Sequence, residues 1–393
     1  MRRTTLLRRA VGPLAITSAL TLALPITGAS AAGNTTGSIR SAAAGSVRSA
    51  TDLPPLPQPN SHGLTLKSWT LVAGYGDRMA DATFTTAAVF TPRGGTPWIN
   101  PVQVPVKVRI YLPAGYRGDP ARPYPVLYLL HGGGADFQQW SQSDSGNLAA
   151  TLAGSAFDGI VVMPEGGRAG WYSDWAGATD GHFAPQWETF HIEQLLPWID
   201  ANFPTVRERS GRAIAGVSMG GYGALRYGGR HPELFSAVGA FSAGTDLYQA
   251  GAQKIIADSM WQVGASIGWT GLLNPWYRVG GDTLHRMETV FGPQSGWAAV
   301  TPVSLALHDA YNGYAGKLAL YAGGANGTGE TDIYGWNHTL HENLDSRGAQ
   351  HRFCTGPGEH SYRYWTEDLK DFVSLVYGTP FAQCPNGWGS PTP

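Results

Sequence analysis

Cysteine is almost absent from this sequence: 393 residues contain two, Cys354 and Cys384. They lack the paired spacing of a cysteine zinc site, and the chain has no H-E-x-x-H motif. We therefore predict no metal site, no catalytic thiol and no cofactor. In an oxidising environment two cysteines near the C-terminus most simply form one disulfide, so we expect Cys354 to pair with Cys384.

Charged residues are also few. They make up 14% of the chain, and the net charge of −1 includes four arginines and no acidic residue within positions 1–31. Without those four positive charges the net charge becomes −5. Nucleic-acid binding needs clustered lysine and arginine, which the remaining chain lacks, so we expect no nucleic-acid partner. A hydrophobic content of 42% indicates a globular protein with a large core.

Long apolar runs are missing as well. After the N-terminal region no segment reaches the roughly 18 apolar residues of a membrane helix, so we expect no stable membrane insertion. Residues 11–24 are mostly apolar but include Gly12 and Pro13. Arginines precede this run and a small-x-small sequence follows at 29–31, which is typical of a signal peptide spanning residues 1–31. We expect a secreted, extracellular protein, and we make no prediction of its oligomeric state.

The remaining chain divides into a linker and one domain. Residues 32–60 are rich in Ala, Ser, Gly and Pro, which predicts a flexible linker. Alternating apolar residues between 64 and 112 predict antiparallel strands at the start of the domain 61–393. Strands then alternate with helices, which indicates a parallel sheet covered on both faces. The predicted strands are 127–130, 160–163, 213–217, 237–241 and 317–321, and the predicted crossover helix is 189–203. Residues 245–314 form a tryptophan-rich insertion that we expect to cover or line the site.

The most informative motif is Gly-Val-Ser-Met-Gly at positions 216–220, a G-x-S-x-G pattern. It follows an apolar run and precedes a helical pattern, which is the context of a nucleophile elbow. Glycines beside the serine let the strand and the helix approach closely, so that the serine oxygen is exposed at the strand end. The motif predicts Ser218 as the nucleophile of acyl chemistry, although a chain with 53 glycines also produces such a pentapeptide by chance.

A second motif, His-Gly-Gly-Gly at 131–134, directly follows the apolar residues 125–130. This pattern supplies half of an oxyanion hole in α/β-hydrolases, and the other half comes from the residue after the nucleophile. We predict that the backbone N–H groups of Gly133 and Met219 stabilise the negative oxygen of a tetrahedral intermediate. The alternative is an ordinary strand-to-loop turn at 131–134.

A serine nucleophile needs a base and an acid. In the fold to which these motifs belong, both follow the serine along the chain, with the acid between the serine and the base. His360 follows a predicted strand at 351–355 and precedes the last helix, so we predict His360 as the base. Glu330 and Asp332 lie in a glycine-rich stretch, 323–332, that we expect to be an extended loop. Residues two apart in an extended loop point the same way, so either carboxylate could orient the imidazole.

With these residues the chain resembles the putative-esterase family of α/β-hydrolases, which includes secreted mycolyltransferases, feruloyl and acetylxylan esterases, and S-formylglutathione hydrolases. Further segments carry the likeness to the mycolyltransferases: Trp171-Tyr172-Ser173-Asp174-Trp175, Trp187-Glu188-Thr189-Phe190, Phe291-Gly292-Pro293 followed by Trp297, Asn326-Gly327-Thr328, and His360-Ser361-Tyr362 with Trp365. The resemblance implies an α/β-hydrolase fold, a mostly parallel central sheet with helices on both faces. It also implies the roles given above for the nucleophile, the base and the oxyanion donors.

The resemblance bears on the open choices too. It favours Glu330 as the acid and assigns Trp175 and Tyr362 to substrate binding. One position departs from the mycolyltransferases: they have an aspartate beside the oxyanion loop that handles sugar, where this chain has His131, as esterases do.

The leading hypothesis is an exported serine carboxylic-ester hydrolase that acts on a small-molecule, polysaccharide or lipid ester. An acyltransferase that moves the acyl group to a sugar or alcohol is the first alternative, because only the acceptor differs. The second is a protein without catalysis that uses its tryptophan-rich face to bind carbohydrate or matrix.

Overall fold

The fold is described from a computed structural model, for residues 56–89, 105–116, 119, 121–176, 184–266, 287–324 and 330–390, the side chains of 260–266 excepted. All of these residues belong to one unit, Ser49–Pro393. The predicted signal peptide and most of the predicted linker 32–60 lie outside the described residues. So do positions 267–286 of the predicted insertion.

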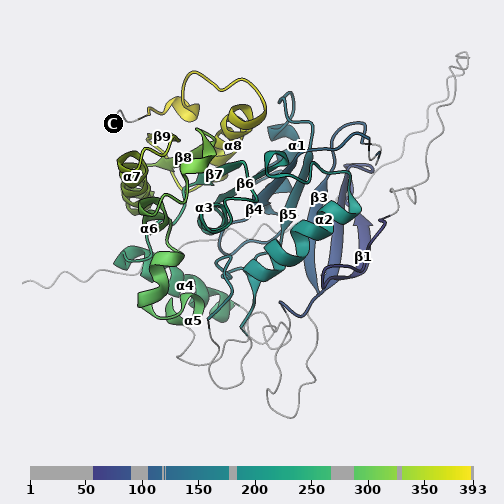
Figure 1. The fold of residues 1–393 in the computed structure, drawn as a ribbon, viewed down its shortest axis with the longest axis horizontal. Coiled ribbons are helices and arrows are strands. Elements are labelled where there is room, and N and C mark those ends of the chain that lie inside the picture. Colours follow the sequence, from purple (N-terminus) through teal and green to yellow (C-terminus); the bar gives the residue numbers. More distant parts are fainter. Residues whose placement is uncertain are drawn as a thin grey trace, which may run out of the picture. The chain divides into compact units, whose positions relative to one another are not determined.

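A nine-stranded sheet forms the centre of the described unit, in the order β1-β2-β3-β5-β4-β6-β7-β8-β9 (Figure 1). The neighbouring pairs β1–β2, β2–β3 and β3–β5 are antiparallel. The pairs β5–β4, β4–β6, β6–β7, β7–β8 and β8–β9 are parallel. Their bounds are Thr65–Leu71, Met79–Thr85, Val106–Tyr111, Val126–Leu130, Ile160–Pro164, Arg212–Val217, Ala237–Phe241, Leu318–Gly323 and Arg352–Gly356. The predicted α/β-hydrolase fold is confirmed.

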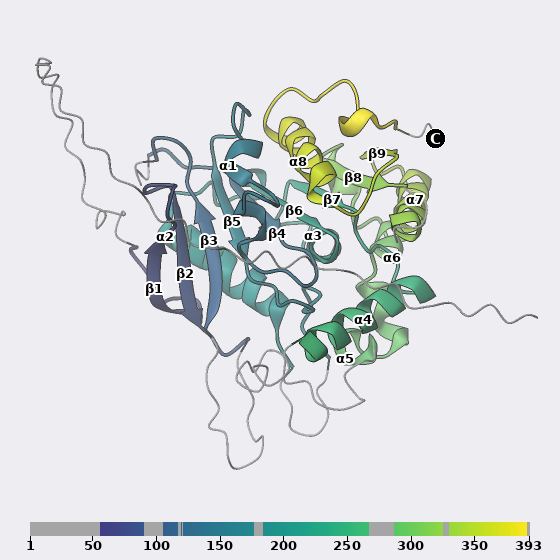
Figure 2. The same ribbon diagram turned by 180° about the vertical axis from the view of Figure 1, so that it is seen from behind.

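Alternation along the buried strands divides the interior into two cores. Val126, Tyr128 and Leu130 of β4 face one core, while Leu127 and Leu129 face the other. Successive side chains of a strand point to opposite faces, so a fully apolar strand needs cover on both sides. Helices α1 (Leu148–Thr151) and α8 (Tyr362–Tyr377) cover one face, and α2 (Leu196–Asn202), α3 (Met219–Arg230) and α6 (Pro302–Leu307) cover the other (Figures 1 and 2).

The crossover helix predicted at 189–203 is present in two parts. A π-helical segment, Thr189–Leu195, continues directly into α2. Phe190, Leu195, Trp198 and Ile199 are completely buried against the sheet.

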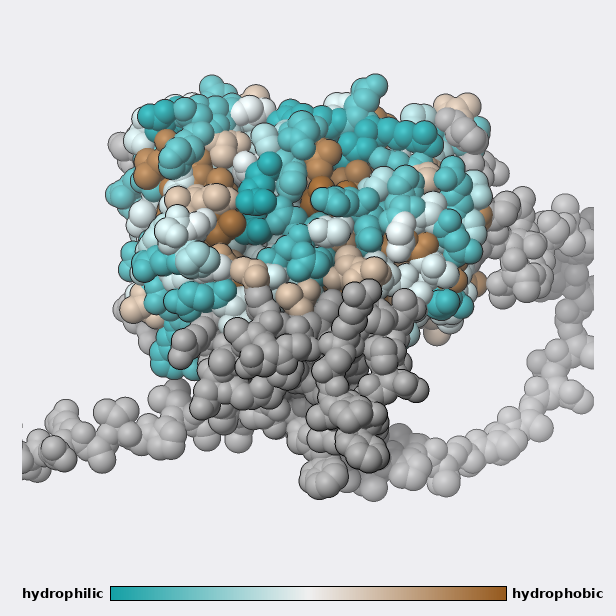
Figure 3. Space-filling model, turned by 60° about the horizontal axis from the view of Figure 1, so that its bottom comes forward, coloured by the Kyte–Doolittle hydropathy of each residue, from teal (hydrophilic) through white to brown (hydrophobic). Residues whose placement is uncertain are grey.

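The insertion predicted at 245–314 contains α4 (Ala250–Ser266), α5 (Met287–Phe291), a 3₁₀ segment (Gln294–Ala299) and α6. Trp297 is buried in the main core, and its indole N–H donates to the Gly292 carbonyl at 3.0 Å, so this tryptophan fills the core. Within the described residues, none of the helices has the length and apolar character that would let it cross a membrane. The described part of the surface in Figure 3 is mostly hydrophilic with scattered apolar spots.

The last part of the chain completes the sheet edge. α7 (Glu330–Ser346) follows β8, and β9 leads to α8 and then to a 3₁₀ turn, Pro385–Gly387. Cys354 and Cys384 form the predicted disulfide.

A buried ion cluster attaches the π-helical segment to α3. Glu188 accepts hydrogen bonds from Arg226 at 2.7 Å and from Arg230 at 2.9 Å, and His231 Nε2 lies 2.7 Å away. Burial alone would raise the pKa of Glu188, but the hydrogen bond with His231 and the two arginine charges outweigh it and lower the pKa to about 2. The cluster therefore stabilises the fold only while Glu188 is ionised.

We expect Glu188→Gln to lower the free energy of unfolding at pH 7 by about 3 kcal/mol. A carboxylate whose pKa is lower in the folded than in the unfolded protein stabilises the fold at pH values above its ordinary pKa. The difference from wild type should shrink as pH falls from 4.5 towards 2, where Glu188 takes up its proton in the folded state as well. Urea titrations across this range measure it. Glu193→Gln, at an exposed position of the same segment, is the control; a constant wild-type-to-variant difference at all pH values would contradict the assignment.

Candidate active site

Ser218 lies at a sharp bend between β6 and α3. Its backbone has φ 54° and ψ −116°, which is strained for a residue with a side chain. The bend brings Gly216 and Gly220 together: a Cβ atom on Gly216 would lie 2.4 Å from the Gly220 carbonyl carbon. Ser218 is partly exposed between buried neighbours, Val217 and Met219. This geometry is that of a nucleophile elbow.

The 131–134 loop lies against the bend. A Cβ atom on Gly132 would be 3.6 Å from the Ser218 Cβ, and one on Gly133 would be 3.9 Å from the Met219 Cβ. Within the described residues, neither the Gly133 N–H nor the Met219 N–H has an acceptor at hydrogen-bonding distance. Met219 begins α3, and the first N–H groups of a helix have no partner within it. Two free donors thus lie next to the serine.

His131 orients this loop. It is 1% exposed, and its Nε2 accepts a hydrogen bond from the Gly166 N–H at 2.9 Å. The proton must therefore be on Nδ1, which donates to the Gly132 carbonyl at 2.9 Å. That carbonyl and the Gly133 N–H belong to the same peptide group, so the imidazole sets the direction of a predicted oxyanion donor. Tyr172 adds support by donating to the His131 carbonyl at 2.9 Å.

Glu330 and His360 are in direct contact. His360 Nδ1 donates to Glu330 Oε2 at 2.7 Å, and the carboxylate is completely buried while the imidazole is 31% exposed. The other oxygen, Oε1, accepts from the Ser242 hydroxyl at 2.5 Å and the Gly323 N–H at 3.1 Å. Three donors thus surround the carboxylate, and together they fix its orientation. The Trp365 indole and the imidazole pack edge to face, with ring centroids 4.7 Å apart.

Asp332 has a different position. The structure begins α7 at Glu330, so the two carboxylates lie in the first turn of a helix and not in the extended loop that the sequence suggested. Positions two apart on a helix differ by roughly 200° around its axis. Glu330 consequently points inward, whereas Asp332 is exposed, with Oδ2 3.3 Å from where a Cβ of Gly251 would be.

Hydrogen bonds link the elbow to the imidazole through the end of β7. The Ser218 N–H donates to the Phe241 carbonyl at 2.8 Å, the next residue is Ser242, and Ser242 binds Glu330, which holds His360. Within the described residues, the Ser218 hydroxyl makes no direct hydrogen bond to His360. In free enzymes this bond is often long and shortens in the substrate complex.

Sequence reasoning missed Ser242. It is 1% exposed with φ 48°, donates to Glu330, and accepts from the Trp365 indole N–H at 2.9 Å. Its only signal in the sequence is that it directly follows β7, the strand that pairs with β6. At such a strand end in a parallel sheet, site residues gather.

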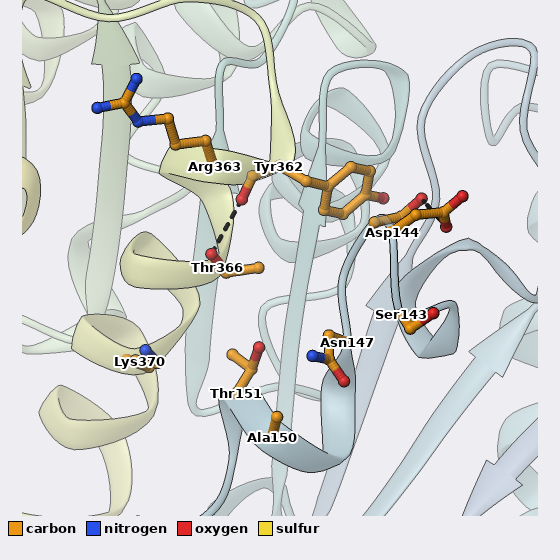
Figure 4. A pocket seen from close by; sticks show the side chains of 10 residues that line it. Ser143, Asp144, Asn147, Ala150, Thr151, Tyr362, Arg363, Thr366 and Lys370 are labelled. Carbon is orange, nitrogen blue, oxygen red and sulfur yellow. Dashed lines mark hydrogen bonds between the residues drawn. The ribbon is translucent and has the colours of Figure 1, made fainter.

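The two predicted substrate-binding residues lie in different surroundings. Trp175 is partly buried, and its indole N–H donates to the Gly170 carbonyl at 3.0 Å. Tyr362 lines a cavity of about 390 Å³ between α1 and α8 (Figure 4). Its ring packs edge-on against Trp140 and Trp365, and burial raises the pKa of its hydroxyl. Ser218 does not line this cavity. The segment Asn326-Gly327-Thr328 lies outside the described residues.

One group of potential metal ligands occurs within the described residues: His341, Asp345 and His351, with ligand atoms within 4.8 Å of one another. His351 Nδ1 donates to the Ala349 carbonyl, and its Nε2 accepts from His341 Nδ1 at 2.7 Å. These hydrogen bonds explain the arrangement as packing of the far end of α7 against β9. His341 is 7% exposed, so it belongs to this packing.

Comparison with known proteins shows the family of this chain. Residues 100–374 match the family described as "Putative esterase". The chain belongs to this family. The resemblance stated from the sequence is thereby confirmed, and membership supports ester hydrolysis or acyl transfer.

The curated relatives in this family include both kinds of enzyme. An esterase of Mycobacterium tuberculosis is 35% identical over 263 residues, which are 65% of this chain and 52% of that protein. The diacylglycerol acyltransferase/mycolyltransferase Ag85B of Mycobacterium leprae is 28% identical over 285 residues, 64% of this chain and 83% of that protein. The chain thus spans about half the length of the first of these relatives.

Solved structures share the fold. An S-formylglutathione hydrolase from Staphylococcus aureus has a TM-score of 0.54 at 18% identity, covering 76% of this chain and 99% of that one. At this level of identity the likeness concerns the fold alone.

Proposed function

We propose that this chain is an exported serine carboxylic-ester hydrolase, with Ser218 as nucleophile, His360 as general base and Glu330 as the acid that orients it. The observation that carries the proposal is the 2.7 Å hydrogen bond between His360 and the buried Glu330. It lies at the carboxyl ends of the parallel strands, where Ser218 occupies a strained bend. The chain order serine, acid, histidine is that of α/β-hydrolases. Export rests on the signal-like residues 1–31.

The chemistry follows from these groups. Ser218 Oγ attacks the ester carbonyl carbon and gives its proton to His360 Nε2, while Glu330 stabilises the imidazolium. The carbonyl oxygen becomes negative and accepts hydrogen bonds from the Gly133 and Met219 N–H groups. The C–O bond to the alcohol breaks, and the alcohol leaves with the proton from His360. Water then attacks the acyl-enzyme by the same steps and releases the acid.

Acyl transfer is the second candidate, supported by the 28% identity to a mycolyltransferase over 83% of its length. It requires a hydroxyl acceptor to outcompete water. The surroundings of His131 favour hydrolysis, because both ring nitrogens are used by backbone groups and the side chain is 1% exposed. This side chain therefore has no group left to bind a sugar where the mycolyltransferases have an aspartate.

A partition experiment separates the candidates. We expect p-nitrophenyl esters of several acyl lengths to give nitrophenol and free acid in equal amounts, with or without trehalose or glycerol. Absorbance measures the nitrophenol, and mass spectrometry measures the acid and any acylated acceptor. An acylated acceptor as the main product would replace hydrolysis by transfer. No turnover, together with no labelling by a fluorophosphonate, would favour the binding protein that lacks catalysis.

A further inference from the structure

The C-terminal segment, residues 384–389, is attached to the strand that leads to His360; we call this segment the C-terminal strap. The disulfide joins Cys384 to Cys354 on β9. Further along, the Thr355 N–H donates to the Gly389 carbonyl and the Gly389 N–H donates to the Thr355 carbonyl, both at 2.9 Å. The strap is therefore fixed to β9 at both of its ends.

Trp388 of the strap packs directly on the loop between β9 and His360. Its indole is 6% exposed and donates to the Pro357 carbonyl at 2.9 Å. A Cβ atom on Gly356 would lie 2.4 Å from the indole, and one on Gly358 would lie 2.7 Å from it. The loop backbone thus touches the ring at two positions where no other residue fits. Tyr364 of α8 stacks on the ring, with centroids 5.7 Å apart and planes at 16°.

The contact continues through the loop to the acid. Gly358 lies between Trp388 and Gly323: its Cβ position is 3.2 Å from the Gly323 Cα. The Gly323 N–H is one of the donors to Glu330 Oε1, and the Gly324 N–H donates to the Gly356 carbonyl at 2.8 Å. The indole therefore packs directly against the loop that carries the imidazole. Through Gly358 it also supports the backbone at Gly323, which orients the carboxylate.

We propose that Trp388 is a positioning residue for His360: by fixing the loop 356–358 against β8, the C-terminal strap holds the imidazole at the distance and angle that proton transfer needs. This inference rests on the proposed function of His360. Within the described residues Trp388 does not contact the imidazole itself, so any effect of Trp388 on His360 must pass through the loop. The segment 356–358, which joins the end of β9 to Glu359, consists of two glycines and one proline, so its conformation depends on outside support.

Kinetics of three variants on a p-nitrophenyl ester test the proposal. Displacements of about 1 Å can cost 10²-fold in rate. We therefore expect Trp388→Ala to lower kcat by about 10–100-fold with KM within about twofold. Trp388→Phe retains a ring for Tyr364 and loses the bond to Pro357, so we expect a kcat loss of about 3–10-fold. Phe381→Ala, at a 50% exposed position of the same C-terminal region, should leave kcat unchanged.

A double-mutant cycle shows whether Trp388 acts through His360. The His360→Ala variant has no imidazole for the loop to position. In this background Trp388→Phe should therefore change the residual rate by less than about twofold. An equal loss in both backgrounds, or a wild-type kcat in both Trp388 variants, would overturn the positioning role while leaving the proposed function intact. A wild-type kcat in His360→Ala alone would remove the proposed function and this inference with it. Phenylalanine occupies most of the indole's space, so this arm does not depend on the alanine variant folding.

Discussion

Replacing Ser218 by alanine should lower kcat by about 10⁵–10⁶-fold on an activated ester, the largest effect that we expect from any single substitution. The variant has no atom that can form the acyl-enzyme bond, whereas the amide donors of Gly133 and Met219 stay in place. Substrate binding and the residual stabilisation of the oxyanion should therefore persist, with KM little changed.

Initial rates on p-nitrophenyl esters and covalent labelling by a fluorophosphonate measure this effect separately. Labelling should occur in wild type and vanish in Ser218→Ala. Ser304→Ala, at a partly exposed position of α6, is the matched control and should label and turn over as wild type does. If Ser218→Ala still labels, the nucleophile is a different residue.

Replacing Glu330 by glutamine should lower kcat by about 10³–10⁴-fold. Glutamine has nearly the same shape, but its amide is neutral and can present N–H groups to His360 Nδ1. That favours the wrong tautomer of the imidazole and removes the charge that stabilises the imidazolium. The hydrogen bonds from Ser242 and Gly323 should keep the amide in position, so the fold should be retained.

Asp332→Asn is the paired experiment, because it makes the same chemical change two residues away. Asp332 is exposed, so its charge is well screened and we expect kcat within about twofold of wild type. Thermal unfolding of both variants checks that neither change acts through stability. A large loss in Asp332→Asn with a small one in Glu330→Gln would transfer the role of acid to Asp332.

The proposed nucleophile and the proposed oxyanion donors could be named from the sequence because these assignments depend on neighbouring residues. A strand that turns into a helix at Ser218 needs glycines at fixed offsets, and the two donors are backbone groups of that turn and of the 131–134 loop. The parallel strands were predictable for a similar reason: β4 and β5 are continuously apolar and β6 is apolar after Arg212, which is typical of strands buried on both faces. β2 was not predicted separately, because its sequence, MADATFT, mixes polar and apolar residues.

The choice between Glu330 and Asp332 could not be made locally. It depends on where α7 begins, since a helical turn separates side chains that an extended loop would place together. The inward direction of Glu330 is then favoured by donors from three other segments: Ser242, Gly323 and His360. No sequence window contains all of these groups.

The sequence alone determined the chemistry that short backbone motifs encode: a serine at a strained bend, two amide donors beside it, a parallel sheet beneath them and a cysteine pair able to bridge. Only the tertiary structure decided which carboxylate meets His360, that Ser242 and His131 orient the groups around the serine, and that Trp388 supports the histidine loop. The physical reason is distance along the chain. Hydrogen bonds and packing between segments far apart depend on how whole elements are placed, and that placement results from burying both faces of the sheet at once.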